Sequence, residues 1–455
     1  MTGTDALYVS LLLGIDVLMF AGLRFSQLRW RLEPELVRKM FHVGGGLLGL
    51  TLPWLFDSMV PVLLLAVLST GAFVALRRVA ALRSGVGQVL HAVERETFGE
   101  FCYIASLLVL FWLARGDKLL FSIPLLILAL ADTFAALIGE QYGRLKLRQL
   151  GPGKSYEGVA AFFLTAFFCI HVPVLLADRT GRLESLLVAC DVALIVMMAE
   201  AVAWRGLDNL IIPLFSYMLL KTALGQDAAQ LASDIAFFLT LALFMRFWRQ
   251  HTPLADDALF GATLVGYVIW SVGGWLWSLP PLTLLALYAM TVRATPGENW
   301  RMHRFPVVLA YVASSSFWLL LYAQSREASL LLPFATCFGA DLAILGLMRL
   351  AARVPGMSTR DAVSIATARG MLVVVPAVVF QSGFTLAALI DLAGCLIAVY
   401  AATAVFARLQ PDLALEPFDA SRWARQVVIV AATSCLAIGI HYGTLPSLDV
   451  HTLVP

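Results

Sequence analysis

The sequence ALADTFAALIGEQYGRLKLRQLGPGKSYEGVAA, residues 129–161, joins two apolar stretches through a loop rich in glycine and basic residues. Its first part has the pattern of a helix with one acid, Asp132. At helical spacing this acid shares a face with Ala136, Gly139 and Gly143. Such a strip of small side chains lets another backbone or a ligand approach closely. The segment therefore predicts a helix, a basic loop and a second helix, with a carboxylate beside a surface open to close approach.

The loop of this segment carries the residues that suit a phosphate ligand. An acid that holds a metal, together with cations that hold phosphate oxygens, is what phosphoryl transfer from a nucleotide needs. Gly153-Lys154-Ser155 matches the end of a GxxxxGK[ST] loop, but Arg148 stands where the first glycine belongs, and no strand precedes it. A glycine-rich turn at a helix start can still hold phosphate through backbone N–H groups. The cations of the loop are Arg144, Lys146, Arg148 and Lys154.

The composition of the whole chain is that of a membrane protein. Of its 455 residues, 60% are hydrophobic and 14% are charged, whereas a soluble domain has about a quarter charged residues. The mean hydropathy of +0.85 agrees with this. The formal net charge of +2 identifies no partner, and we expect no nucleic-acid partner. The six cysteines stand singly, without CxxC or Cys/His spacing, so we expect no structural metal and no disulfide framework.

Apolar runs of about 17–22 residues, the length that crosses a bilayer, recur along the chain. The first run lacks the flanking residues of a signal peptide, so we expect it to be retained. Several runs are short or broken by Pro or Gly, and we predict an all-α polytopic membrane protein with 14 to 16 spans. The expected helices are 7–23, 41–56, 59–76, 98–114, 119–140, 158–176, 185–203, 207–222, 233–248, 259–276, 279–292, 305–324, 329–350, 364–381, 383–406 and 426–444.

Lys and Arg are unevenly distributed between alternate loops. With the N-terminus outside, the inside segments of the first half hold fourteen Lys and Arg residues, and the outside connections hold four. Cytoplasmic loops carry the excess of positive charge in membrane proteins. We therefore predict an outside N-terminus, with the motifs described here on the cytoplasmic side. Polar residues collect at 223–232 and near 250–258, and either stretch suits a boundary; we predict two domains, 1–225 and 226–455.

Two groups of charged residues stand at the predicted cytoplasmic ends of spans. Arg38 and Lys39 open the second span, where basic residues either anchor the helix at the membrane surface or bind phosphate. His42 follows one turn later, and the glycines at 44–46 predict a closely packed, partly hydrated position. Glu100 opens the fourth span, and we expect it to pair with Arg38 or Lys39 or to contribute to a metal site.

Further acids stand at the same predicted level of the membrane. A carboxylate as deep as Asp132 is costly and is a functional candidate, against the alternative of a hydrogen bond between packed helices. Glu157 is placed to favour the following helix N-terminus or to take a metal. Glu200 ends one span, and Asp208-Asn209 begin the next. Asp-Asn there is an ordinary N-cap pattern, and its conjunction with Glu200 and Asp132 favours a function.

In their order and spacing these motifs resemble the dolichol kinase/phytol kinase family of integral-membrane, CTP-dependent lipid kinases. The resemblance covers roughly residues 30–220 and includes the family pattern DT.A...G...G.........GKS.EG around the loop. More distantly, the chain is similar to phosphatidate cytidylyltransferases, which share CTP use. The stretches that carry the resemblance are RKMFHVGGG (38–46), ETFGE (96–100), ADTFAALIGEQYGRLK (131–146), GPGKSYEGVAAF (151–162) and GLDNLIIPL (206–214).

The resemblance implies transfer of the CTP γ-phosphate to a lipid alcohol, with the nucleotide on the cytoplasmic side. We expect Mg²⁺ to bridge phosphate oxygens, with Asp132 as its first ligand and Glu157, Glu200 or Asp208 as the second. His42 or a carboxylate would orient or deprotonate the hydroxyl.

The expected nucleotide-binding residues include the cations that neutralise charge developing on the transferred group, namely Lys154 with Arg144 and with Arg38 or Lys39. The expected partners are CTP, the lipid alcohol and membrane lipids. The remaining residues expected to bind the nucleotide are Gly139, Gly143, Gly153, Ser155, Glu157, Asp208 and Asn209.

Two other functions compete with this interpretation. A transporter or flippase also shows broken spans and an intramembrane acid, but its polar residues gather at the bilayer midplane. Cytidylyl transfer to a lipid phosphate is the alternative within enzymes. The C-terminal half contains no lysine from Thr222 to Pro455, and only the late Ala-Asp pair at Asp341 echoes Asp132. We expect this half to be a diverged kinase-like module or an accessory scaffold that does not turn over nucleotide.

Overall fold

The computed structural model of the chain describes residues 2–78, 99–145, 154–202, 208–252, 254–293, 304–354, 356–410, 412–413 and 420–448. The chain forms two compact units, Met1–Phe237 and Phe238–Pro455. The division falls inside a helix, α13 (Ala228–Trp248), just after the polar stretch at which the sequence predicts a boundary. Among the described residues there is no β-strand, so the all-α prediction is confirmed.

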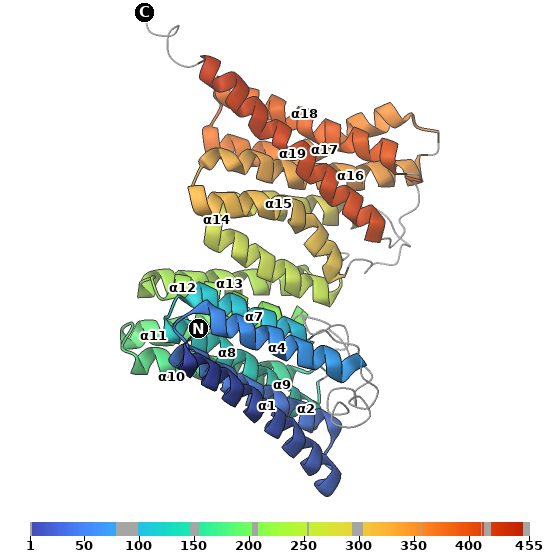
Figure 1. The fold of residues 1–455 in the computed structure, drawn as a ribbon. Coiled ribbons are helices and arrows are strands. Elements are labelled where there is room, and N and C mark those ends of the chain that lie inside the picture. Colours follow the sequence, from blue (N-terminus) through green and yellow to red (C-terminus); the bar gives the residue numbers. More distant parts are fainter. Residues whose placement is uncertain are drawn as a thin grey trace, which may run out of the picture. The chain divides into compact units, whose positions relative to one another are not determined.

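The N-terminal unit is a bundle of helices that are mostly long and apolar (Figure 1). Its core is formed by side chains such as Phe121, Leu128, Phe162 and Ile170, all fully buried. These residues come from the fifth and sixth expected helices, whose inward faces contribute to this core. Its helices are α1 (Gly3–Trp30), α2 (Pro34–Leu50), the short α3 (Leu52–Leu55), α4 (Met59–Arg78), α7 (Gly99–Ala114), α8 (Lys118–Leu126), α9 (Asp132–Gln141), α10 (Tyr156–Leu176), α11 (Arg182–Val202) and α12 (Asp208–Ala223), with the start of α13.

One span changes its helical pitch directly before Asp132. α8 is followed by a turn of π-helix, Ile127–Ala131, and then by α9. The complete segment Lys118–Gln141 is long and apolar enough to cross a membrane. Single π-turns inside α-helices are frequent at functional sites because they disturb the regular spacing of backbone groups. The expected helix at 119–140 is therefore present, but with an irregularity that its apolar pattern does not reveal.

Within the described residues, the C-terminal unit contains six long helical segments after α13. The expected helices 259–276 and 279–292 form one continuous segment, α14, which is kinked at Gly274. The φ of Gly274 is 71°, a left-handed value that a residue without a side chain adopts readily. The elements after α13 are α14 (Asp256–Arg293), α15 (Phe305–Ser325), a short 3-10 turn (Ala328–Leu330), α16 (Leu331–Arg353), α17 (Thr359–Ser382), α18 (Leu386–Leu409) and α19 (Ala420–Leu448).

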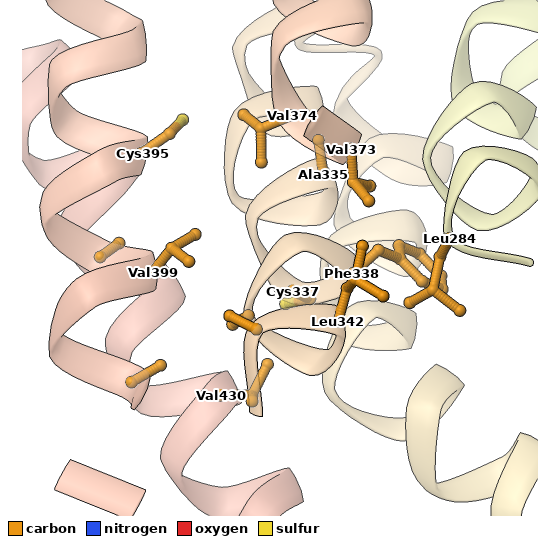
Figure 2. Packing of buried hydrophobic residues seen from close by; sticks show 14 of the residues in the cluster. Leu284, Ala335, Cys337, Phe338, Leu342, Val373, Val374, Cys395, Val399 and Val430 are labelled. Carbon is orange, nitrogen blue, oxygen red and sulfur yellow. The ribbon is translucent and has the colours of Figure 1, made fainter. Parts of the chain in front are cut away.

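The core of this second unit surrounds α16. Every residue in the apolar window of the Ala328–Arg353 span is buried. In Figure 2, Cys337, Phe338 and Leu342 of α16 lie between Leu284 of α14 and Val399 of α18. A helix that is apolar all round is one that neighbours cover on every side, and α16 is the central helix of this unit.

The described residues include eleven helices that are long and apolar enough to cross a membrane. The shorter α7 is also apolar. The protein is therefore an integral membrane protein with many spans. The expected total of 14 to 16, which counts α2, α11, α12 and the two arms of α14 as separate spans, stays a prediction, as does the orientation of the N-terminus.

Candidate functional site

A buried ion pair links α2 to the start of α9. Lys39 is 4% exposed, and its Nζ lies 2.6 Å from Oδ2 of Asp132 and 3.4 Å from the Asp132 carbonyl oxygen. The two residues are 93 positions apart in the chain. An apolar setting strengthens the attraction between opposite charges and makes either one costly alone. Lys39 and Asp132 therefore form a buried pair that ties α2 to α9 beside the π-turn.

His42 lies one turn after Lys39 on the same face of α2. Its Nε2 is 3.1 Å from the carbonyl oxygen of Leu128, within the π-turn, and 3.7 Å from Oδ2 of Asp132. Both neighbours accept hydrogen bonds, so Nε2 carries the proton that it donates to the Leu128 carbonyl. In the neutral ring this leaves Nδ1 as a proton acceptor.

Asp208 brings a second carboxylate to this group from the first residue of α12. It lies within electrostatic reach of Asp132, Lys39 and His42, and Arg38 interacts with both acids. The Oδ1 atom of Asp208 is buried and has no hydrogen-bond partner in the described part of the chain. A buried carboxylate oxygen without a donor is unusual in a folded protein. We call Lys39, His42, Asp132 and Asp208 the central cluster.

Arg38 is held beside this cluster by an acid of its own helix. Its Nε and Nη2 donate to the two carboxylate oxygens of Glu35, at 2.9 and 2.5 Å. Such a two-pronged pair fixes the guanidinium more firmly than a single contact does. Arg38 therefore faces the site from the start of α2, where it is partly open to solvent.

Lys154 forms a second pair, with the end of α11. Its Nζ donates to the carbonyl oxygens of Glu200 and Ala201, at 2.5 and 3.0 Å, and lies 3.1 Å from Oε1 of Glu200. A cation at the C-terminal end of a helix is favoured by the helix dipole. Glu200 also interacts electrostatically with Asp132 and Asp208, so the Lys154–Glu200 pair borders the central cluster.

The strip of small residues allows α10 to pack closely on α9. A Cβ added to Gly143 would lie 2.1 Å from the Gly139 carbonyl oxygen and 2.5 Å from Oγ of Ser155. One added to Gly158 would lie 2.8 Å from the carbonyl oxygen of Ala135. Ser155 is buried, and its Oγ accepts the backbone N–H of Gly158. The expected close approach is thus made by another backbone, and a nucleotide role for Gly139, Gly143 and Ser155 stays a prediction.

Glu157 and Asn209 hold backbone in place. Oε1 of Glu157 accepts the backbone N–H groups of Arg144 and Leu145, at 3.0 and 3.3 Å, so it ties the loop end to the start of α10. The Nδ2 of Asn209 donates to the carbonyl oxygen of Gly99 at 3.0 Å, which joins α12 to α7. Gly153 lies outside the described residues, as do Lys146 and Arg148.

The prediction that Glu100 pairs with Arg38 or Lys39 is wrong. Its carboxylate pairs with Arg77 of α4, whose Nη2 lies 2.7 Å away, and not with Arg38 or Lys39. Arg77 ends α4 and Glu100 begins α7, so the two are neighbours at the same end of adjacent helices. Arg38 and Lys39 are taken by Glu35 and Asp132.

Two polar residues near the site were missed by the sequence reasoning. The hydroxyl of Tyr103 on α7 donates to the carbonyl oxygen of Gly45, 2.8 Å away, and its ring lies 6.4 Å from that of His42. Asp16 on α1 interacts electrostatically with Tyr103. A lone acid in the middle of an apolar span indicates a functional candidate, and this criterion identifies Asp16 from the sequence. No signal in the sequence marks Tyr103.

The donor atoms of the central cluster fit a magnesium ion in part. Mg²⁺ takes one or two protein carboxylates and completes its shell with water and phosphate oxygens. The unpartnered Oδ1 of Asp208, beside Asp132, is such a ligand. No group of three or more His, Cys, Asp or Glu side chains within the described ranges is arranged to hold a metal by itself. The cluster therefore suits a cation that arrives with its phosphates.

Comparison with curated proteins gives a match to a phytol kinase from Synechocystis sp. The two sequences are 32% identical over 195 residues, which span 42% of this chain and 81% of the Synechocystis protein. The chain belongs to the phytol kinase family. No family model matches it, and no solved structure matches it. The resemblance drawn from the motifs is thus confirmed, and the central cluster belongs to a member of the phytol kinase family.

Proposed function

We propose that this protein transfers the γ-phosphate of CTP to the hydroxyl of a long-chain isoprenoid alcohol of the phytol, farnesol or dolichol type. The observation that carries the proposal is the central cluster, which places a lysine, a histidine and two carboxylates together at the ends of apolar helices. Membership of the phytol kinase family supports the acceptor class. CTP as the donor follows from the motif resemblance alone.

The position of the cluster suits a reaction between a lipid and a soluble nucleotide. The acceptor carries a primary hydroxyl on an apolar tail, so it must be met where helices border the bilayer. The donor is a triphosphate and must reach the same place from water. The excess of Lys and Arg in the loops on this side of the bundle supports a cytoplasmic site, with the N-terminus on the opposite face.

The carboxylates would hold the metal that accompanies the nucleotide. Bound Mg²⁺ supplies positive charge that offsets the negative charge of the phosphate oxygens. Asp132 and Asp208 are the ligands we propose, because they lie together and Asp208 has an unpartnered oxygen. Glu157 is committed to the backbone of Arg144 and Leu145, and Glu200 to Lys154, so they are weaker candidates.

The cations would then bind the phosphates. Lys39 and Lys154 are each paired with an acid, at 2.6 and 3.1 Å. If Asp132 holds the metal, Lys39 would be available to phosphate oxygens, while Lys154 beside Glu200, with Arg38 and Arg144, would add positive charge at the rim. His42, whose Nε2 donates to Leu128, would accept the hydroxyl proton at Nδ1 or orient the hydroxyl.

The test is an acceptor panel with purified full-length protein in detergent. CTP labelled in its γ-phosphate is supplied with Mg²⁺ and phytol, farnesol, geranylgeraniol, dolichol or diacylglycerol, one at a time. We expect a labelled lipid phosphate from at least one isoprenoid alcohol and much less from diacylglycerol. ATP, GTP and UTP serve as competing donors. Absence of label in every isoprenoid product, with protein that remains folded, would refute the proposal.

A further inference from the structure

The C-terminal unit contains a buried polar cluster in which several side chains lack partners. Nε2 of Gln426, on α19, donates to Oδ1 of Asp341, on α16, at 2.7 Å, and both residues are 1% exposed. The remaining oxygens, Oδ2 of Asp341 and Oε1 of Gln426, are buried without a hydrogen-bond partner in the described residues. Buried polar atoms are nearly always paired. Two unpaired acceptors in one contact indicate that something polar is bound there.

Arg422 lies one turn before Gln426 on the same face of α19. It is 2% exposed. Its Nη2 contacts the sulfur of Met348 at 2.8 Å, and its guanidinium carbon lies 4.4 Å from the ring centre of Trp423. Its Nε has no partner, and it forms no ion pair with any acid in the described ranges. A buried cation costs much free energy unless an anion compensates it. The neutral contacts of Arg422 leave its charge uncompensated.

Arg349, in the same turn of α16 as Met348, brings a second guanidinium to this end of the helix. It follows Met348, the residue that Arg422 contacts. Its guanidinium carbon lies 4.8 Å from the ring centre of Tyr288, and Nη2 is 3.5 Å from the Tyr288 hydroxyl. Its Nη1 is buried and unpaired among the described residues. Both arginines are thus placed near the same end of α16, each against an aromatic ring, and neither forms an ion pair with an acid in the part of the chain that the structure describes.

The start of α19 adds a third feature that favours an anion. The helix begins at Ala420, so Arg422 and Trp423 lie in its first turn. The first backbone N–H groups of a helix have no partner within it, and the helix dipole makes this end positive. Arg422 and the start of α19 thus lie beside Met348, the neighbour of Arg349 in α16, and the free oxygens of Asp341 and Gln426 belong to the same contact between α16 and α19.

We propose that Arg349 and Arg422 form a binding site for a phosphate group in the C-terminal unit, with Gln426 and Asp341 accepting hydrogen bonds from it. Arginine binds phosphate oxygens through its planar array of donors. A singly protonated phosphate also carries one O–H group, which suits the free oxygen of Asp341 or of Gln426. The group can belong to a phosphorylated lipid or to free phosphate. The site does not depend on the kinase activity proposed for the N-terminal unit.

The test uses Trp423 as a reporter in the full-length protein, without nucleotide. Because the Trp423 ring lies against Arg422, an anion bound there should change the fluorescence emission of Trp423. The emission of Trp423 is obtained as the difference between the wild-type protein and Trp423→Phe. The probes are geranyl monophosphate, inorganic phosphate and, as a ligand without phosphate, geraniol. We expect the two phosphates to change the Trp423 emission and geraniol to leave it unchanged. Tighter binding of geranyl monophosphate would identify a lipid phosphate as the ligand, and equal or tighter binding of inorganic phosphate would identify free phosphate.

Substitutions decide whether the arginines are responsible. Arg422→Gln and Arg349→Gln should each raise the apparent Kd at least tenfold. Arg349 is only half-buried, so its variant keeps the test valid if Arg422→Gln does not fold. Arg326→Gln is the matched control, because Arg326 also rests on an aromatic ring, that of Tyr322, but is exposed. No Trp423 response to either phosphate, or an unchanged Kd in Arg349→Gln, would overturn the proposal.

Discussion

Asp132 and Lys39 form a buried ion pair, so a substitution of either residue leaves the charge of the other without its partner. Asp132→Asn keeps the size of the side chain but leaves Lys39 buried without its counter-charge, which costs about 3–5 kcal/mol in comparable cases. If Asp132 is also a metal ligand, activity should fall by roughly 10³-fold or more, as when a key electrostatic group is removed. Initial rates and thermal unfolding of the purified variant measure both effects.

A double variant separates the two roles of Asp132. Lys39→Met combined with Asp132→Asn removes both charges, so the thermal stability that Asp132→Asn loses should largely return. Activity should stay low, because the metal ligand is still missing. Recovery of near wild-type turnover in the double variant would show that Asp132 serves only to neutralise Lys39.

Lys154 tests the nucleotide loop. Lys154→Ala removes the ammonium group that contacts Glu200 and should raise the KM for CTP or lower kcat, by about tenfold for one lost charged contact. Lys154→Arg should rescue only in part, because a planar guanidinium does not reproduce a compact ammonium. The measurement is a CTP titration, with Arg179→Ala as the control, since Arg179 pairs with Asp117 at a distant exposed position. Unchanged kinetics in Lys154→Ala would exclude a phosphate role.

At the scale of the elements, the contact between α9 and α10 depends on glycine. A methyl group at Gly143 would lie 2.5 Å from Oγ and 2.7 Å from Cβ of Ser155, the N-cap of α10, and 2.1 Å from the Gly139 carbonyl oxygen of α9, which is backbone and cannot rotate away. Gly143→Ala should therefore destabilise the protein by about 1–3 kcal/mol, as overpacking does, and should reduce activity by moving the loop. Gly71→Ala is the control, because nothing lies within 4 Å of a methyl group there. Equal melting temperatures for the two variants would contradict the packing described here.

The helices themselves were predictable because each apolar run has the length of a span. The expected ranges agree with the observed helices to within a few residues at most ends, as for 158–176 against Tyr156–Leu176. The π-turn before Asp132 was not predictable, since its residues are as apolar as those of an ordinary helix. The partner of Glu100 was also missed, because the choice between Arg77 and Lys39 depends on which helices are neighbours.

The candidate site was predictable in its membership but not in its pairing. Acids and cations at the same level of a membrane protein are few, so Asp132, Lys39, His42 and Asp208 could be named from the sequence. Which cation contacts which acid depends on distances of a few ångströms that no spacing encodes. The structure brings Lys39 to Asp132 and Lys154 to Glu200, and it commits Glu157 to the loop backbone.

At the scale of the whole molecule, the two units should divide the work. Asp391 of the C-terminal unit is 4% exposed, and its Oδ1 lies 2.8 Å from Nδ1 of His441. It is therefore a buried aspartate beside a histidine, as Asp132 is beside His42, and serves as the matched control. Asp391→Asn should leave CTP consumption within about twofold of wild type, because substitutions without shared partners act independently. The assay is CDP release under the conditions used for Asp132→Asn. Loss of CTP consumption in a folded Asp391→Asn protein would place catalysis partly in the second unit.

The most direct measurement follows the two ends of the triphosphate through the reaction. Wild-type protein, Mg²⁺ and the best isoprenoid alcohol are incubated in parallel with CTP labelled in the γ-phosphate and with CTP labelled in the α-phosphate. A kinase transfers only the γ-label to the lipid and releases the α-label as CDP, which is the predicted result. Appearance of the α-label in the lipid, with release of pyrophosphate, or of neither label in the lipid, would contradict the account.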